Sequence, residues 1–95
     1  MKRTSMKIWD IMIPSKMTSS KPKLYKVMGM KAYYRKYKHF YGSVIIDSKS
    51  HTVLDGYVII YTAKEMKIND IPVTIVTKRE RFTRFLKRIF RKKVN

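Results

Sequence analysis

The 95-residue sequence contains no cysteine and only six acidic residues. Without cysteine the chain has no disulfide, no thiolate metal ligand and no thiol nucleophile. Its two histidines, His39 and His51, have no carboxylate pattern around them, so we expect neither a metal site nor a cofactor. No stretch approaches the ~20 apolar residues of a membrane-spanning helix, and the N-terminus lacks the apolar core of a secretory signal. These absences indicate a cytoplasmic protein.

Positive charge, by contrast, is abundant. The chain has 23 lysines and arginines and a formal net charge of +17. Such a surplus exceeds what solubility requires and indicates a polyanionic partner, either nucleic acid or an acidic membrane surface. The length and the 44% of hydrophobic residues suit a single folded domain with one modest core.

The charge is concentrated at the two ends of the chain. Residues 1–38 carry eleven basic residues against one acid, and residues 78–95 carry nine against one. The stretch 39–77 has three basic and four acidic residues and is therefore nearly neutral. We expect a folded centre that bears two cationic elements.

The apolar patterns predict the order strand, helix, two strands, helix, strand, helix. We expect strands at 7–13, 43–47, 51–55 and within 69–76, and helices over 24–37, 57–66 and 79–93. The strand at 7–13 is expected to end at Pro14, and Gly29 is expected to weaken the first helix. This order favours an α+β fold, in which helices pack against a small mixed sheet.

Apolar side chains at three- and four-residue spacing define the expected buried faces of the helices. In the first helix they are Leu24, Val27, Met30, Tyr34 and Tyr37. In the second they are Val58, Ile59, Thr62, Ala63 and Met66. In the third they are Phe82, Phe85, Leu86, Ile89 and Phe90.

The stretch 44–76, "VIIDSKSHTVLDGYVIIYTAKEMKINDIPVTIV", resembles the small domain shared by ParB-type chromosome partition proteins and sulfiredoxin. Its most specific part is "DGY" followed by "AKEMKINDIPV", where a hairpin ends in Asp-Gly, a helix follows and a strand closes the unit. The resemblance covers about residues 6–76. It implies an α+β domain over 1–77 with a separate basic amphipathic helix over 78–95.

The resemblance also implies a nucleotide-phosphate site at the Asp55-Gly56 turn, because helix N-termini bind anions. Active members of the family place an arginine three residues after the glycine, where this chain has Ile59. The catalytic cysteine of sulfiredoxin would fall at Tyr57, and a phenol cannot replace a thiolate. We therefore expect no enzyme activity, and we favour a structural turn over residual nucleotide binding, with Asp55 as a cap or dipole partner of the helix.

No other catalytic constellation replaces the missing one. Serines and threonines are plentiful, but no histidine and carboxylate accompany them in a known signature. Asp47 and Asp55 are the only acidic pair that we consider for a metal-dependent nuclease. Turn capping accounts for both aspartates more simply.

The C-terminal helix is the first candidate for nucleic-acid contact. Its basic residues are Arg79, Arg81, Arg84, Lys87, Arg88, Arg91, Lys92 and Lys93. Three interpretations are open: arginines that follow phosphates, a helix lying on an acidic membrane, or a core helix with a solvated basic face. The predominance of arginine and the presence of a second basic element favour nucleic acid over the membrane.

The second candidate is "KAYYRKYKHFY", residues 31–41, where cations alternate with aromatic rings. The cations are Lys31, Arg35, Lys36 and Lys38. Rings beside cations can stack on exposed bases while the charges hold the backbone. We expect Tyr34 and Tyr37 in the core, which leaves Tyr33 and His39 free to stack.

These observations predict a non-catalytic protein that binds DNA or RNA through phosphate contacts, with little sequence preference. An alternative is a phage or mobile-element inhibitor that binds a host nucleoprotein, such as an RNA-guided nuclease, in the manner of an anti-CRISPR protein. A further alternative is a nucleotide-binding enzyme of the ParB/sulfiredoxin superfamily.

Overall fold

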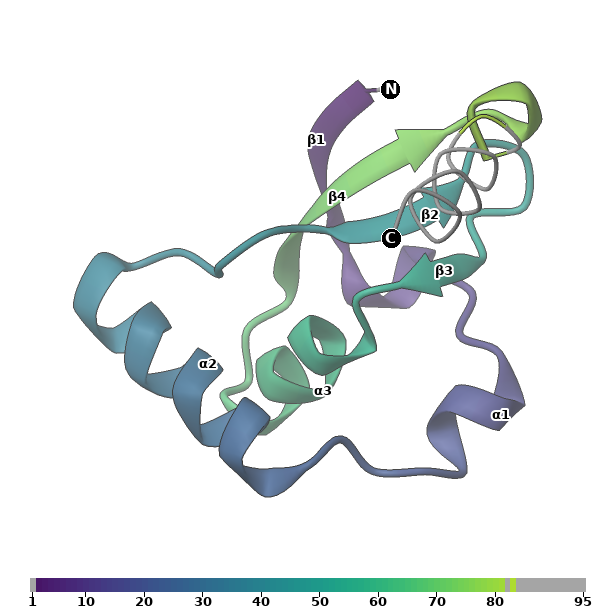
Figure 1. Ribbon diagram of the computed structural model, residues 1–95. Helices are drawn as coiled ribbons and strands as arrows, with labels where there is room; N and C mark the ends of the chain where they lie inside the picture. Colours follow the sequence, from purple (N-terminus) through teal and green to yellow (C-terminus); the bar gives the residue numbers. More distant parts are fainter. Residues whose placement is uncertain (1, 82, 84–95) are drawn as a thin grey trace, which may run out of the picture.

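The computed structural model describes residues 2–81 and 83. The strands are β1 (Lys2–Lys7), β2 (Val44–Asp47), β3 (Val53–Asp55) and β4 (Asp70–Val76). The helices are the 3-10 turn η1 (Ile8–Asp10), the short α1 (Ser15–Thr18), α2 (Leu24–Tyr37) and α3 (Tyr57–Glu65). Figure 1 shows how they are arranged. The expected α+β class is confirmed.

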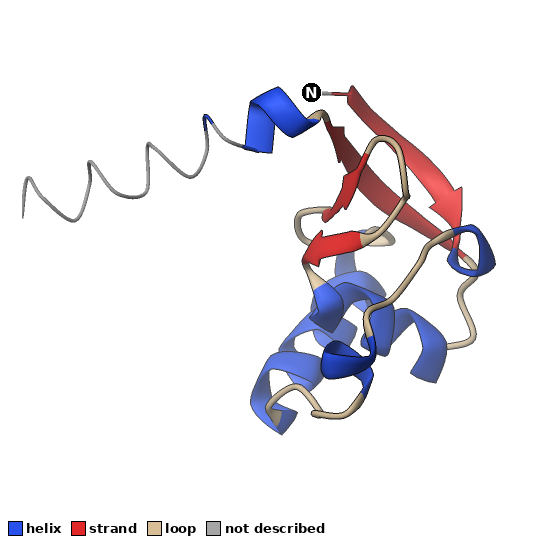
Figure 2. Ribbon diagram, turned by 90° about the vertical axis from the view of Figure 1, so that its right-hand side faces the viewer, coloured by secondary structure: helices blue, strands red, loops and turns tan. Residues whose placement is uncertain are grey.

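The four strands form one mixed sheet in the order β1-β4-β2-β3. The central strand β4 pairs antiparallel with β1 and parallel with β2, while β2 and β3 form an antiparallel hairpin. Helix α3 packs against β2 and β4, and α2 packs against α3. Figure 2 shows the main helices on one side of the strands. The layers are therefore sheet, α3 and α2.

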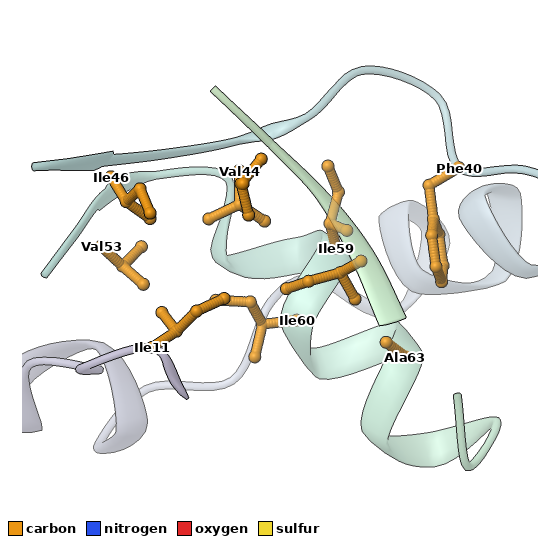
Figure 3. Close-up of a cluster of buried hydrophobic side chains, with 10 residues drawn as sticks. Ile11, Phe40, Val44, Ile46, Val53, Ile59, Ile60 and Ala63 are labelled. Carbon is orange, nitrogen blue, oxygen red and sulfur yellow. The ribbon is translucent and has the colours of Figure 1, made fainter. Parts of the chain in front are cut away.

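The core lies between α3 and the sheet. Val44, Ile46, Ile60, Ile71 and Val73 are fully buried, and the same cluster includes Ile11, Phe40, Val53, Ile59 and Ala63. Figure 3 shows side chains of the β2–β3 hairpin facing those of α3. Burial of such aliphatic groups contributes about 1.5–3 kcal/mol per side chain.

The predicted positions of β2, β3, β4, α2 and α3 are confirmed to within a few residues. Each of these elements has either a continuous apolar run or a helical apolar period. Residues 78–81 and 83 are helical, as predicted, whereas the remainder of the expected C-terminal helix lies outside the described residues.

The first strand is not where the pattern placed it. The prediction of a strand at 7–13 is wrong, because β1 is Lys2–Lys7 and the chain then turns through η1. β1 is an edge strand of sequence KRTSMK, with five of six residues exposed, so it carries no apolar signal. The apolar side chains of Ile8, Ile11 and Ile13 pack on the core from an irregular segment instead.

The buried faces of the helices also differ from the predicted ones. In α2 only Val27 is buried, while Leu24 is 73% and Tyr37 49% exposed. In α3 the buried residues are Ile59, Ile60, Thr62 and Ala63. α3 is covered by the sheet on one side and by α2 on the other, so its burial does not follow a single stripe. α2 packs mainly on one helix, which leaves most of its surface exposed.

We predict that Gly29→Ala stabilises the protein by up to about 1 kcal/mol, because alanine restricts the unfolded chain and favours a helix interior. A Cβ at Gly29 would meet nothing within 4 Å. Urea unfolding followed by circular dichroism measures the change. A loss of stability would show that α2 does not have this helical conformation around Gly29.

Candidate nucleic-acid interface

The Asp55-Gly56 turn is a tight structural junction between β3 and α3. Gly56 has φ of 92°, and the Asp55 carboxylate accepts a hydrogen bond from its N–H at 2.8 Å. A Cβ at Gly56 would lie 3.0 Å from the Cα of Val44 and 3.2 Å from the carbonyl oxygen of Ser43. Both the left-handed conformation and the close approach to β2 therefore require glycine. The N-cap residue of α3 is Gly56, so the expected capping by Asp55 is wrong, whereas its role as a dipole partner stays a prediction.

Beside this turn lies an open hollow of about 380 Å³, which we call the turn hollow. Its cations are Lys21, Lys23 and Lys26, from the segment before α2 and its first turn. Ile59, where the family resemblance leads us to expect an arginine, is 3% exposed and belongs to the core. The turn hollow thus combines lysines with a helix N-terminus, but no arginine lines it that could bind a phosphate through two hydrogen bonds.

Asp47 and Asp55 do not converge. Asp55 pairs with Ile45 in the hairpin, so the two aspartates lie at opposite ends of the β2–β3 ladder. The Asp47 carboxylate accepts hydrogen bonds from the backbone N–H groups of Lys49 and Ser50 at 3.1 and 3.0 Å. The bond from the Ser50 backbone N–H is the main cause of a lowered pKa of Asp47. The predicted turn capping by Asp47 is confirmed.

Helix α2 ends at Lys38, whose backbone is in the left-handed conformation. Lys38 has φ of 64°, and its N–H donates to the carbonyl oxygen of Tyr34 at 2.7 Å. The chain reverses there, so that Phe40 is 5% exposed and packs on Tyr34 with ring centroids 4.7 Å apart. His39 and Tyr41 lie instead against Tyr33.

The rings of Tyr33, Tyr37, His39 and Tyr41 form what we call the aromatic cluster. The ring centroid of Tyr33 lies 4.5 Å from that of Tyr37, 5.6 Å from that of His39 and 5.4 Å from that of Tyr41. Tyr33 is half-buried, whereas Tyr37 is 49% and Tyr41 68% exposed. The expectation that Tyr37 lies in the core is therefore wrong. The expectation that Tyr34 lies in the core is confirmed, since Tyr34 packs against it. Tyr41 belongs to the predicted element 31–41, but the sequence pattern did not distinguish it from the other rings.

Of the four cations predicted on this helix, Lys36 and Lys38 lie next to residues of the aromatic cluster. Arg35, Lys36 and Lys38 are exposed, and the Lys36 ammonium lies 5.3 Å from the ring centroid of Tyr37. Lys31 is instead engaged with α3, because its ammonium donates to the Glu65 carboxylate at 2.7 Å. That hydrogen bond is the main cause of a lowered pKa of Glu65. Lys31 thus joins α2 to α3.

A second hollow, of about 370 Å³, adjoins the aromatic cluster, and we call it the cationic hollow. Arg3 of β1 lines it together with Lys38 and His39, so β1 adds a cation that the sequence patterns did not indicate. Asp70 also lines the cationic hollow, but its carboxylate is paired with the ammonium of Lys7 at 2.7 Å. The net charge of these lining residues is therefore positive.

The basic C-terminal element begins at a capping box. The Glu80 N–H donates to the Thr77 hydroxyl at 3.2 Å, and the Thr77 N–H donates to the Glu80 carboxylate at 3.1 Å. A threonine followed three residues later by a glutamate is the sequence signal for a capping box. A search for apolar periodicity does not detect this signal. Arg79 and Arg81 are exposed, with the Arg81 guanidinium 3.8 Å from the Asp47 carboxylate.

Only the first residues of the predicted C-terminal helix are described, and they do not lie beside the end of α2. The end of α2 and the beginning of the C-terminal helix lie at opposite sides of the molecule in Figure 1. The other predicted contact residues, Arg84, Lys87, Arg88, Arg91, Lys92 and Lys93, lie outside the described residues. No helix in the described part of the chain is long and apolar enough to cross a membrane.

Comparison with solved structures identifies the fold. The chain is similar to sulfiredoxin from Arabidopsis thaliana, with a TM-score of 0.68 and 13% identity over 84% of this chain and 92% of that one. Two structures of a Pnob8-like ParB N-domain match with TM-scores of 0.62 and 0.57 at 12% identity, over 78% and 83% of this chain. This chain corresponds to only 29% of either ParB chain. No protein-family model and no curated protein matches the sequence. The chain has a ParB/sulfiredoxin-like fold, as its sequence motifs indicated.

We predict that Gly56→Ala destabilises the protein by about 2 kcal/mol or more. A left-handed alanine costs roughly 1–2 kcal/mol, and the new Cβ would also displace the backbone of β2. Gly42→Ala is the matched control, since Gly42 has φ of 82° but nothing within 4 Å of an added Cβ. Equal losses in urea unfolding for the two variants would show that α3 does not depend on this close approach.

Proposed function

We propose that the protein binds nucleic acid without catalysing a reaction, through phosphate contacts that carry little sequence preference. The observation that supports this most strongly is the shortage of acidic partners. Among the lysines and arginines of residues 2–81 and 83, only Lys7, Lys31 and Arg81 lie at ion-pair distance from a carboxylate of the same residues. With a net charge of +17, the other cations are available to a polyanion.

The end of α2 is the surface on which we place the contact. Arg35, Lys36 and Lys38 are exposed there, and Arg3 of β1 extends the positive charge across the cationic hollow. The arginines are suited to bidentate contacts with phosphate oxygens, and the lysines contribute point charges. The ParB/sulfiredoxin-like fold is compatible with this proposal.

The proposal that the protein is not an enzyme rests on the turn between β3 and α3. Tyr57 stands where sulfiredoxin has its cysteine, and Ile59, where the family has its arginine, is buried in the core. Tyr57 has no thiolate for the sulfiredoxin reaction, and the aliphatic side chain of Ile59 cannot bind a phosphate.

We predict that affinity for duplex DNA, single-stranded DNA and structured RNA falls steeply with salt. The logarithm of the association constant should decrease linearly with the logarithm of salt concentration, by about 0.9 per phosphate contact on duplex DNA. The triple variant Arg35→Gln, Lys36→Gln, Lys38→Gln should lower that slope by roughly 2–3, because each phosphate that loses its contact with the protein keeps its bound counterion. Fluorescence anisotropy with labelled oligonucleotides measures both effects.

A triple variant with the same charge provides the control: Lys16→Gln, Lys49→Gln, Lys64→Gln. These three lysines are exposed but belong to α1, the hairpin turn and α3. Equal slopes for the two variants would show that the end of α2 is not a preferred surface. Affinity that does not change with salt would refute the proposal. Tighter binding to an RNA-guided nuclease complex than to its free RNA would instead support the inhibitor function.

A second candidate function is binding of a nucleotide phosphate in the turn hollow. It is favoured by Lys21, Lys23 and Lys26, which line the same hollow as the first residues of α3. A ligand at 100 times its dissociation constant should then stabilise the fold by about 2.7 kcal/mol.

We predict that any such stabilisation by ATP, CTP or GTP is strongly reduced in Lys23→Gln, Lys26→Gln, because the phosphates lose two of the three lysines of the turn hollow. Thermal unfolding with and without nucleotide measures it, and Lys16→Gln, Lys49→Gln serves as the control. Stabilisation that persists in the Lys23, Lys26 variant would place the nucleotide elsewhere.

A further inference from the structure

We infer that the aromatic cluster and the adjoining cationic hollow bind single-stranded nucleic acid, with unpaired bases stacked on Tyr37 and Tyr41 and the backbone phosphates beside Arg3 and Lys38. The inference rests on the proposed function and adds to it the class of nucleic acid and the contact with the bases. It concerns the described residues alone.

The exposure of the rings is the first reason. Tyr37 and Tyr41 are 49% and 68% exposed, so they contribute little to the core of the protein. Both nevertheless pack on the half-buried ring of Tyr33, at 4.5 and 5.4 Å. Rings that are held in position by a neighbour lose little conformational entropy when a base stacks on them.

The position of the rings is the second reason. It depends on the left-handed turn at Lys38, which sends Phe40 inward while His39 and Tyr41 stay at the surface. Lys38 and His39 also line the cationic hollow, so the same short turn connects the aromatic cluster to the charged surface. Stacking rings beside a cationic groove are the usual elements of a single-strand binding site.

The charge around the rings selects the occupant. Arg3, Lys36 and Lys38 are exposed cations, whereas Asp70, the acidic residue of the hollow, is paired with Lys7. This combination favours a ligand that carries both phosphates and planar rings. A duplex presents phosphates but keeps its base faces stacked inside, so it can use the cations without the tyrosines.

The test compares three labelled ligands of equal length at one salt concentration: oligo(dT), the same backbone with abasic sites throughout, and duplex DNA. The full chain should bind oligo(dT) at least about tenfold more tightly than the abasic strand, because stacking contributes about 1–3 kcal/mol per base. Oligo(rU) is the fourth ligand, and its affinity relative to oligo(dT) tells whether RNA or DNA is the better partner.

Tyr37→Ala and Tyr41→Ala should each weaken binding to oligo(dT) by on the order of tenfold, while the affinities for the abasic strand and the duplex stay unchanged. The salt slope should also stay the same, since no cation is removed. Tyr25→Ala is the matched control, because Tyr25 is a 67% exposed tyrosine near the other end of α2. Tyr37→Phe should retain the wild-type affinity, since the ring that stacks is kept.

The possible failures can be told apart. If no ligand binds with a steep salt dependence, the proposed function fails together with the inference. If binding is salt-dependent but the abasic strand binds as well as oligo(dT), or if the two alanine variants bind like Tyr25→Ala, only the stacking inference fails. Loss of binding to acidic vesicles in the alanine variants, without any effect on oligo(dT), would assign the rings to a membrane surface and overturn the inference.

Discussion

The close approach of Gly56 to β2 is the contact on which the rest of the molecule depends. Only a residue without a side chain can bring the start of α3 to within contact distance of the Val44 backbone. From that junction α3 runs along the sheet and places Ile59, Ile60 and Ala63 in the core. A turn that the family resemblance associates with a phosphate site thus has a mechanical role in this chain.

The exposed surface of α2 follows from the same arrangement. Since α3 lies between α2 and the sheet, α2 reaches the core through few residues, of which Val27 is the only buried one. Lys31 holds it to α3 through Glu65. The helix can therefore carry cations and tyrosines over most of its surface without loss of packing.

The acidic residues explain why few of the cations in the described part of the chain are paired with a carboxylate. Asp47 and Asp55 bind backbone N–H groups in turns, and Glu80 completes a capping box. Glu65 and Asp70 each hold one lysine. Of these carboxylates, three also pair with a cation, Asp47 with Arg81, Glu65 with Lys31 and Asp70 with Lys7. Six acidic residues cannot balance 23 basic ones, so the excess of cations is left for an external polyanion.

The sequence by itself determined the composition of the chain: the excess of basic residues and the absence of cysteine are covalent facts that folding does not change. It also determined the hairpin, α3 and β4, because their apolar patterns are local and continuous. Only the tertiary structure decided the position of β1, a polar edge strand whose pairing with β4 leaves no periodic signal, and the exposure of Tyr37. It alone decided the aromatic cluster and the cationic hollow, because both depend on one left-handed residue, Lys38, and on Arg3 of a strand distant in sequence. Such a site is made by long-range packing, and no local pattern of residues specifies it.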